Sequence, residues 1–209
     1  MNIVIIGANG GVGRCLVEQA LAEGHQVTAA VRNPAGVNRT HERLRVLTCD
    51  AMDEASVCRA LEGQDVVFCT LGEKSRGPTS LYSKGALNTL LGMQANNVRR
   101  LVFLSNFGIL GERAQDLGGA LLLFLVKSFI RHTLDDHLRA LQEIRAHAPE
   151  WIVVRPMALT NGPCTGRYRV AADGIPAKGR KVARADVAHF MLRQATGNDY
   201  LNQIPAIAY

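Results

Sequence analysis

The sequence predicts an α/β fold, a single-domain Rossmann-like doubly wound parallel sheet with a small C-terminal substrate-side substructure. Short apolar runs of the kind that form buried strands alternate with helical patterns along the chain. The first run is followed at once by a glycine-rich turn and a helix, and no repeat or low-complexity segment interrupts the alternation. We interpret residues 1–209 as one domain, with substrate-side elements mainly within 106–182.

The chain begins with a strand, a glycine turn and a helix. Residues 3–6 are all Ile or Val, which is typical of a strand buried on both faces. Gly7, Gly10 and Gly13 follow, and apolar residues then recur at helical spacing up to Gly24. Bare glycine backbone can approach a pyrophosphate closely while the helix N–H groups face the anion. We expect a dinucleotide at this turn, and an ordinary strand-to-helix loop is the alternative.

Residues 25–31 predict a second strand, which ends at Arg32. In a dinucleotide fold this strand end meets the adenosine ribose. An acidic residue there would bind the ribose hydroxyls and repel a 2′-phosphate, whereas an arginine can pair with that phosphate. We therefore expect NADP(H) to be preferred over NAD(H), with a solvated surface arginine as the alternative.

The remaining elements are expected in alternation. Asp53 is expected to cap a helix, and Asp50 could accept a hydrogen bond from the adenine amino group. Strands are predicted at 44–50, 65–72, 98–105 and 151–156, and helices at 54–61, 81–97, 133–147 and from 182 onward. Leu87, Leu90, Leu91 and Gln94 are expected along one face of the 81–97 helix.

Ser105 ends the predicted 98–105 strand, at the edge of the sheet where the active crevice of such folds lies. Its hydroxyl is expected to serve a substrate or nicotinamide, and a serine bonded to its own backbone is the alternative. The apolar residues 118–130 form either a helix over the substrate pocket or an interface patch, and packing onto the core is the more common outcome for such a run.

Composition narrows the function classes. The net charge is +6, but the basic residues are spread along the chain and aromatic residues make up only 5%, so we expect no nucleic-acid partner. No apolar run is long enough for a membrane, and the strand at residue 3 leaves no room for a signal peptide. The five scattered cysteines contain no C-x-x-C pair. We expect a cytoplasmic protein with free thiols and no metal site.

With these residues in view, the chain resembles the atypical short-chain dehydrogenase/reductases of the NAD(P)H-binding, NmrA-like kind along essentially its whole length. Within them it is most similar to the NADPH-dependent flavin reductase branch, which includes biliverdin-IX-beta reductases. The resemblance is carried by residues 7–13, 31–34, 49–50, 71–72, 135–137, 154–156, 165–168 and 185–193. It implies cofactor contacts from Gly7, Asn9, Gly10, Gly11, Val12, Arg32, Asp50, Ala51, Leu71, Gly72, Ser105, His137, Met157, Ala158 and Leu159.

The resemblance also suggests Ser105 and His137 as catalytic residues, with His137 near the nicotinamide. Ala158 stands where the flavin reductase branch carries a histidine. Most short-chain dehydrogenases pass a proton to a carbonyl through a Tyr-x-x-x-Lys pair. Here no tyrosine precedes a lysine by four, and Thr133 and His137 stand at the corresponding helix.

Hydride transfer to a flavin or quinone places negative charge on a delocalised ring that solvent can protonate, so it needs orientation more than a dedicated acid. We therefore expect an NADPH-dependent oxidoreductase that passes hydride to a flavin, quinone or similar conjugated acceptor, acting as a monomer or weak homodimer. The alternative is a non-catalytic NADP(H)-binding redox sensor or regulatory protein, in which the apolar residues 118–130 would form a partner interface.

Overall fold

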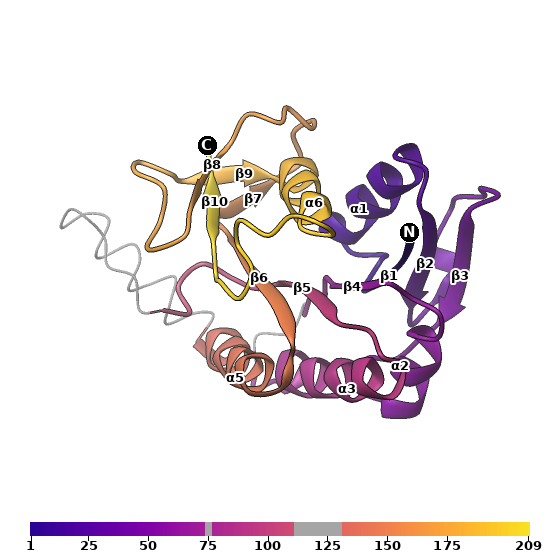
Figure 1. The fold of residues 1–209 in the computed structure, drawn as a ribbon. Helices are drawn as coiled ribbons and strands as arrows, with labels where there is room; N and C mark the ends of the chain where they lie inside the picture. The colour runs from indigo at the N-terminus through magenta and orange to yellow at the C-terminus, as the bar shows by residue number, and fades with distance from the viewer. Residues whose placement is uncertain (74–76, 111–130) are drawn as a thin grey trace.

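The computed structural model describes residues 1–73, 77–110 and 131–209 (Figure 1). Its main sheet has eight strands in the order β3-β2-β1-β4-β5-β6-β10-β8, and only the β10–β8 pairing is antiparallel. The α/β Rossmann fold that the sequence predicts is therefore confirmed. The strands are β1 Asn2–Ile6, β2 Gln26–Val31, β3 Leu44–Thr48, β4 Val66–Cys69, β5 Arg100–Leu104, β6 Glu150–Pro156, β7 Ala158–Thr160, β8 Arg169–Ala171, β9 Lys181–Ala183 and β10 Ala206–Ala208. The helices are α1 Gly11–Ala22, α2 Glu54–Ala60, α3 Leu81–Ala95, α5 Arg131–His147 and α6 Arg184–Arg193, with a short 3₁₀ turn, η1, at Pro34–Gly36.

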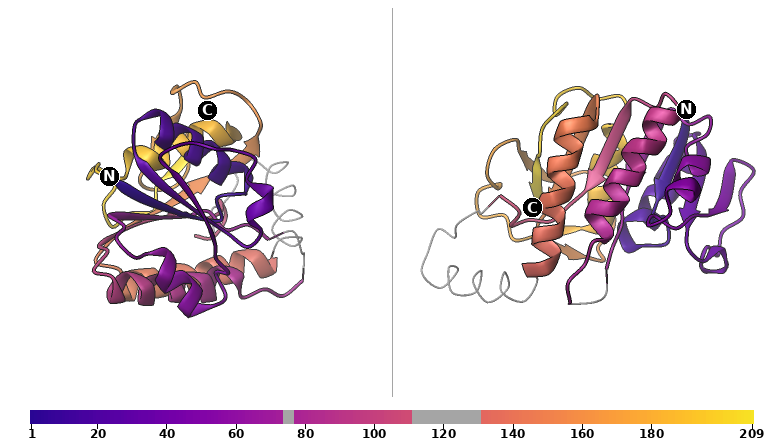
Figure 2. Two further views of the ribbon diagram at one scale, coloured as in Figure 1. Left: turned by 90° about the vertical axis from the view of Figure 1, so that its right-hand side faces the viewer. Right: turned by 90° about the horizontal axis from the view of Figure 1, so that it is seen from below.

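Helices cover both faces of the sheet (Figures 1 and 2). Alternate residues of β1 therefore enter two separate cores. Ile3 and Ile5 pack with α1 and α6, whereas Val4 and Ile6 pack with α2, α3 and α5. Because both faces of β1 are buried, its sequence is continuously apolar rather than alternating.

The strand order reverses direction at β1. The chain proceeds outward from β1 to β2 and β3, then returns to pair β4 on the other side of β1 and continues to β5 and β6. The carboxyl ends of β1 and β4 therefore border the point at which such sheets bind their ligands. All the residues proposed from the sequence for the cofactor follow strands at this edge, except His137, which lies on α5.

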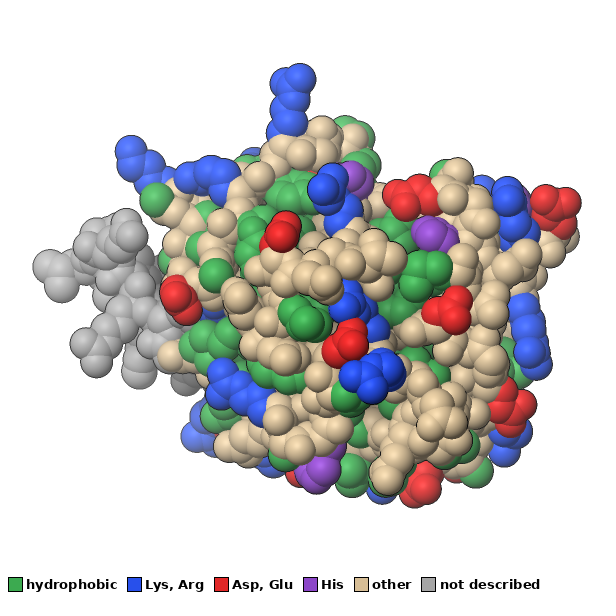
Figure 3. Space-filling view, viewed as in Figure 1, with side chains coloured by type: hydrophobic (Ala, Val, Ile, Leu, Met, Phe, Trp, Pro, Cys, Tyr) green, Lys and Arg blue, Asp and Glu red, His purple; other side chains and the backbone are tan. Residues whose placement is uncertain are grey.

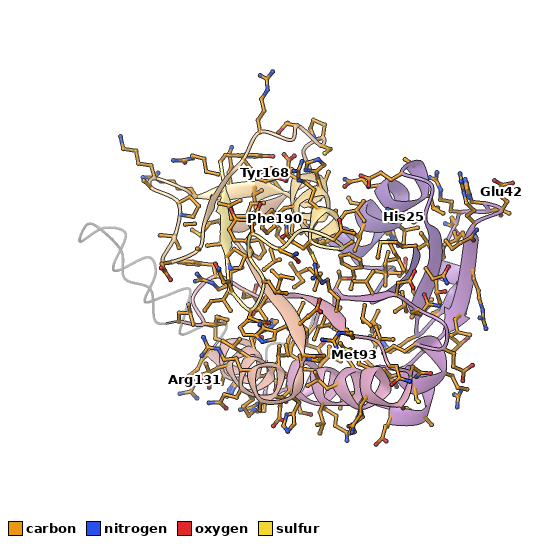
Figure 4. All side chains as sticks on the ribbon, in the orientation of Figure 1. His25, Glu42, Met93, Arg131, Tyr168 and Phe190 are labelled. Carbon is orange, nitrogen blue, oxygen red and sulfur yellow. The ribbon has the colours of Figure 1, made fainter. Side chains whose placement is uncertain are left out.

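The C-terminal substructure differs in detail from the sequence prediction. Val182 and Ala183 belong to β9, which pairs with β7, so the last helix begins at Arg184 and not at 182. The tail adds a strand, β10, that the sequence pattern does not reveal and that inserts between β6 and β8. Tyr168 lies edge to face against Phe190 of α6, with ring centroids 5.9 Å apart (Figure 4).

The buried face of α3 also differs from the expectation. Leu91 and Gln94 are exposed, whereas Met93 points into the core beneath the sheet (Figure 4). The helix is packed between α2 and α5, so its buried surface is wider than a single apolar stripe. The apolar residues 118–130 predicted as a pocket cover or interface lie outside the described residues.

The described residues show how charge, apolar length and potential metal ligands are distributed. Acidic and basic side chains are interspersed over the face drawn in Figure 3. None of the described helices combines the length and hydropathy that a membrane crossing requires. Within the same ranges no three His, Cys, Asp or Glu side chains gather as metal ligands would. Cys49 and Cys69 are buried and Cys164 is exposed, and all five thiols are free.

Asp186 holds the C-terminal substructure together. Its buried carboxylate accepts hydrogen bonds from the backbone N–H groups of Thr165 and Gly166, each at 2.8 Å, and from the hydroxyls of Thr165 at 2.8 Å and Tyr209 at 2.7 Å. One side chain at the start of α6 therefore fixes both the 165–166 turn and the end of the chain.

We expect Asp186→Asn to destabilise the protein by about 2 to 4 kcal/mol, because an amide nitrogen would face donors that require an acceptor. Urea unfolding at neutral pH measures the loss. Asp199→Asn, at an exposed position nearby, is the matched control and should stay within about 0.5 kcal/mol of the parent. Equal stability of the two variants would contradict the anchoring role.

Candidate cofactor and active site

The turn after β1 is fixed by a contact with β4. Gly7 has φ +81°, a left-handed conformation that favours glycine, and a Cβ at this residue would lie 2.7 Å from the Thr70 carbonyl oxygen. The Thr70 hydroxyl donates to the carbonyl oxygens of Ile6 at 3.0 Å and Gly7 at 3.2 Å. The backbone therefore leaves β1 at a fixed angle, pressed against the neighbouring strand.

The beginning of α1 is open to a ligand. Gly10 is the N-cap residue, and no side chain caps the helix. Gly13 is packed tightly, since a Cβ there would lie 2.5 Å from the Gly7 carbonyl oxygen, but Gly10 and Gly11 are exposed. Uncapped N–H groups beside bare glycine backbone form a cradle that fits a diphosphate. The strand, glycine turn and helix expected from the sequence are therefore present, and the dinucleotide at this turn remains a prediction.

Asn9 connects the glycine turn to the segment after β2. Its Oδ1 accepts hydrogen bonds from Nε and Nη2 of Arg14 at 2.9 and 2.6 Å. A Cβ at Gly36 of η1 would lie 2.1 Å from its Nδ2, so η1 is packed directly onto this amide. Arg32 is exposed at the end of β2 and makes no hydrogen bond or ion pair with the described residues, which leaves its guanidinium open to a phosphate.

The segments after β3 and β4 form a second wall beside the turn. Asp50 is exposed, and its Oδ1 accepts from the Met52 N–H at 3.0 Å. Ala51 is buried, and its carbonyl oxygen accepts from Nδ2 of Asn88 at 2.8 Å. Leu71 is half-buried, and Gly72 is exposed with open space where its Cβ would be.

Sequence reasoning missed two residues of α3 that shape this wall. Gly85 lets the helix approach closely, because a Cβ there would lie 2.6 Å from Cδ1 of Leu71. Asn88 is fully buried, and its Oδ1 has no hydrogen-bond partner among the described residues. The signal that could have identified Asn88 is an amide at a helical position next to small and apolar residues, since a buried amide needs a partner.

Ser105 and His137 lie in the interior rather than at the surface. Each is 3% exposed, and Oγ of Ser105 and Nδ1 of His137 have no hydrogen-bond partner among the described residues. The alternative that Ser105 bonds its own backbone is therefore not realised. His137 lies edge to face on Phe103, with centroids 6.2 Å apart, and Phe103 shares a strand face with Ser105 two positions later. Both orphan polar groups thus belong to the same side of the sheet.

His137 is electrically neutral in the folded protein at ordinary pH. Burial lowers the pKa of His137 to about 3, although the neighbouring Asp136 carboxylate acts to raise it. Its ring lies on that of Tyr82 with centroids 3.7 Å apart. The hydroxyl of Tyr82 accepts from the Glu73 N–H at 2.9 Å, and burial raises the pKa of its phenol, so Tyr82 stays protonated at ordinary pH.

Asp136 binds the first turn of α3. It accepts from the Tyr82 N–H at 2.8 Å and from the Ser83 hydroxyl, and it forms an ion pair with Arg139 at 3.1 Å. The carboxylate therefore caps a neighbouring helix whose own N-cap residue, Ser80, makes no side-chain cap. Its hydrogen bonds hold α5, and with it His137, against α3.

Residues 157–159, expected to contact the cofactor, follow β6 and enter β7. Their backbone is held on both sides, since the Met157 N–H donates to Ile207 and the Ala158 N–H to Arg180. Met157 and Leu159 are half-buried and Ala158 is exposed. The structure thus places these residues at the carboxyl end of β6, at the same edge of the sheet as the glycine turn.

The parallel sheet, its reversal at β1 and the uncapped glycine turn together define a Rossmann-type dinucleotide-binding protein. The chain belongs to the NAD(P)H-binding family, whose model matches residues 7–198.

Several characterised and solved proteins are similar to this chain. Cinnamoyl-CoA reductase 1 of Petunia hybrida is 31% identical over 117 residues, which cover 51% of this chain and 35% of that protein. A putative exported protein from Burkholderia pseudomallei is 27% identical, with a TM-score of 0.80 and 100% of both chains covered. The anaerobillin reductase ChuY from Escherichia coli O157:H7 is 20% identical, with a TM-score of 0.81, and the match covers 100% of this chain and 97% of that one. The chain spans about a third of the curated reductase's length, so that relative's activity is not transferred with the match.

We expect the buried His137 to make the protein less stable in acid. Between pH 6.5 and about pH 3 the unfolded chain takes up a proton at His137 and the folded chain does not, so the free energy of unfolding falls as pH falls. From pH 7 to pH 5 this group alone should cost about 2 kcal/mol. Urea unfolding at both pH values measures it.

His137→Phe retains an aromatic ring against Tyr82. In this variant the free energy of unfolding should fall by about 2 kcal/mol less between pH 7 and pH 5 than in the parent protein. His147→Gln, at an exposed histidine of the same helix, is the control and should keep the parent's dependence. The same loss of stability between pH 7 and pH 5 in parent and His137→Phe would show that His137 titrates normally.

Proposed function

We propose that the protein is an NADPH-dependent oxidoreductase that passes hydride to a flavin, quinone or similar conjugated acceptor. The observation that carries this proposal is the neutral His137 at the helix position where a Tyr-x-x-x-Lys pair would be expected. An imidazole with a pKa of about 3 is neutral near pH 7, and its remaining N–H is far too weakly acidic to serve as a general acid. An acceptor whose reduced form delocalises charge needs no such donor.

In this proposal, some residues bind the phosphates of the cofactor and others orient its nicotinamide and the acceptor. The N–H groups at Gly10–Val12 and the guanidinium of Arg32 would hold the phosphates of NADPH, which supplies the hydride when bound. Ser105 would donate a hydrogen bond to the nicotinamide or to the acceptor, and its unpartnered Oγ is compatible with that role. Burial of Ser105 and His137 keeps water away from the transferred hydride.

A cofactor-sensing role without turnover is the second candidate. It is favoured by the same burial, because Ser105 and His137 are each only 3% exposed and lie among packed side chains. The fold also supports reductases, such as the anaerobillin reductase among its structural neighbours. Measured turnover with an acceptor separates the two candidates.

With NADPH, we expect the purified protein to reduce flavins and quinones at least about 100-fold faster than simple ketones, because the ketone alkoxide would have no proton donor. Absorbance at the NADPH band follows each reaction. Ser105→Ala should lower kcat/KM by about 10-fold, as for loss of one hydrogen bond in the transition state. Ser80→Ala, an exposed serine that caps no helix through its side chain, is the control. NADPH binding without oxidation by any acceptor would favour the sensing role.

Replacement of Arg32 should change the cofactor preference. Arg32→Gln is expected to weaken NADPH binding about 10- to 100-fold, as for loss of an ionic hydrogen bond to the 2′-phosphate, and to leave NADH binding within about twofold. Titration of protein fluorescence gives both dissociation constants. Arg145→Gln removes an exposed charge from the last turn of α5 and serves as the control. A parent protein that binds NADH as tightly as NADPH would refute the preference.

A further inference from the structure

A second arginine lies directly over the glycine turn. Arg184 is the first residue of α6, far from the turn in sequence, and it follows β9 immediately. A Cβ at Gly11 would lie 2.6 Å from Cδ, 2.7 Å from Nε and 3.7 Å from Cζ of Arg184. The side chain therefore crosses the first residue of α1 at contact distance, in the space that the missing Gly11 side chain leaves open.

A hydrogen bond to Asn161 holds the guanidinium of Arg184 in this position. Its Nη1 donates a hydrogen bond to Oδ1 of Asn161 at 2.7 Å, and Asn161 follows β7 directly. Only this bond from the Arg184 side chain is made within the described ranges, so Nε and Nη2 retain N–H donors for another acceptor. Arginine fixed by one neutral amide keeps its full charge for a ligand.

The charge of Arg184 reaches the helix start. Its guanidinium acts to lower the pKa of the Cys15 thiol, although burial has the larger effect and raises it. Two further charged side chains on α1 lie in the same region: Arg14, whose Nε and Nη2 are engaged with Asn9, and Glu18, one turn further along the helix. An anion at the uncapped N–H groups of α1 would therefore meet the Arg184 guanidinium, whose Nε and Nη2 have no partner among the described residues.

We propose that Arg184 is a binding residue for the cofactor's pyrophosphate, positioned by Asn161. The backbone N–H groups of the glycine turn would bind the diphosphate on one side, and the guanidinium of Arg184 would bind it on the other. Residue 11 must be a glycine, because a side chain there would collide with Arg184. Asn161 belongs to the segment that continues residues 157–159, which are themselves expected to contact the cofactor. The inference rests on the NADPH site of the proposed function and is independent of any acceptor.

Three ligands separate this role from that of Arg32. ADP-ribose contains the pyrophosphate but no 2′-phosphate. Adenosine 2′-monophosphate contains the 2′-phosphate but no pyrophosphate, and NADPH contains both groups. We expect Arg184→Gln to raise the dissociation constants of ADP-ribose and NADPH about 10- to 100-fold and to leave that of adenosine 2′-monophosphate unchanged. Arg32→Gln should raise the dissociation constant of adenosine 2′-monophosphate and leave that of ADP-ribose unchanged. Calorimetric or fluorescence titration measures all three without turnover.

Arg180→Gln is the matched control, because it removes an exposed positive charge close in sequence and should change no constant more than about twofold. Arg184→Lys should recover part of the affinity, and Asn161→Ala should lose about two- to fivefold through a less ordered guanidinium. Melting temperatures without ligand, equal within error among the variants, show that folding is intact.

Several results would overturn the proposal. ADP-ribose binding that is unaffected by Arg184→Gln, or lost equally in Arg180→Gln, would show that Arg184 makes no specific contact with the diphosphate. Failure of the parent protein to bind ADP-ribose at all would also exclude it. An absence of acceptor reduction alongside the expected binding pattern would reject the proposed reductase activity alone.

Discussion

The contact between Gly7 and Thr70 is the constraint on which the rest of the site depends. β1 and β4 are adjacent strands that the chain reaches far apart in sequence, and the Thr70 hydroxyl bonds the last carbonyls of β1. No Cβ fits between the two backbones, so the chain must turn at once into α1. This geometry directs the uncapped end of α1 toward the edge of the sheet where the other loops converge.

Two arginines lie apart at this edge of the sheet. Arg32 follows β2, just before η1, whereas Arg184 begins α6 and lies over Gly11. Asn9 joins the two regions, because it accepts from Arg14 and packs against Gly36. An arginine placed by tertiary contacts binds a phosphate more effectively than a mobile surface arginine, since less side-chain freedom is lost on binding.

Features set by neighbouring residues could be predicted from the sequence. The glycine turn and the Asp53 cap, which accepts from the Ala55 N–H at 3.2 Å, depend on short-range chemistry, and both expectations are confirmed. β10 and the close approach of Arg184 depend on pairings between distant segments, which local patterns do not encode. The exposed Leu91 of α3 has the same cause, because packing between two helices, not periodicity, decides which residues are buried.

The surroundings of His137 explain why its ring is neutral. Among the described residues, Asp136 is the carboxylate that acts to raise the pKa of His137, and its lone pairs are already directed to the first turn of α3 and to Arg139. A carboxylate committed to these partners offers His137 no hydrogen bond that would compensate for desolvation of an imidazolium, so the neutral ring is the stable form. The capping bond that secures α3 against α5 therefore also helps to keep the ring of His137 neutral.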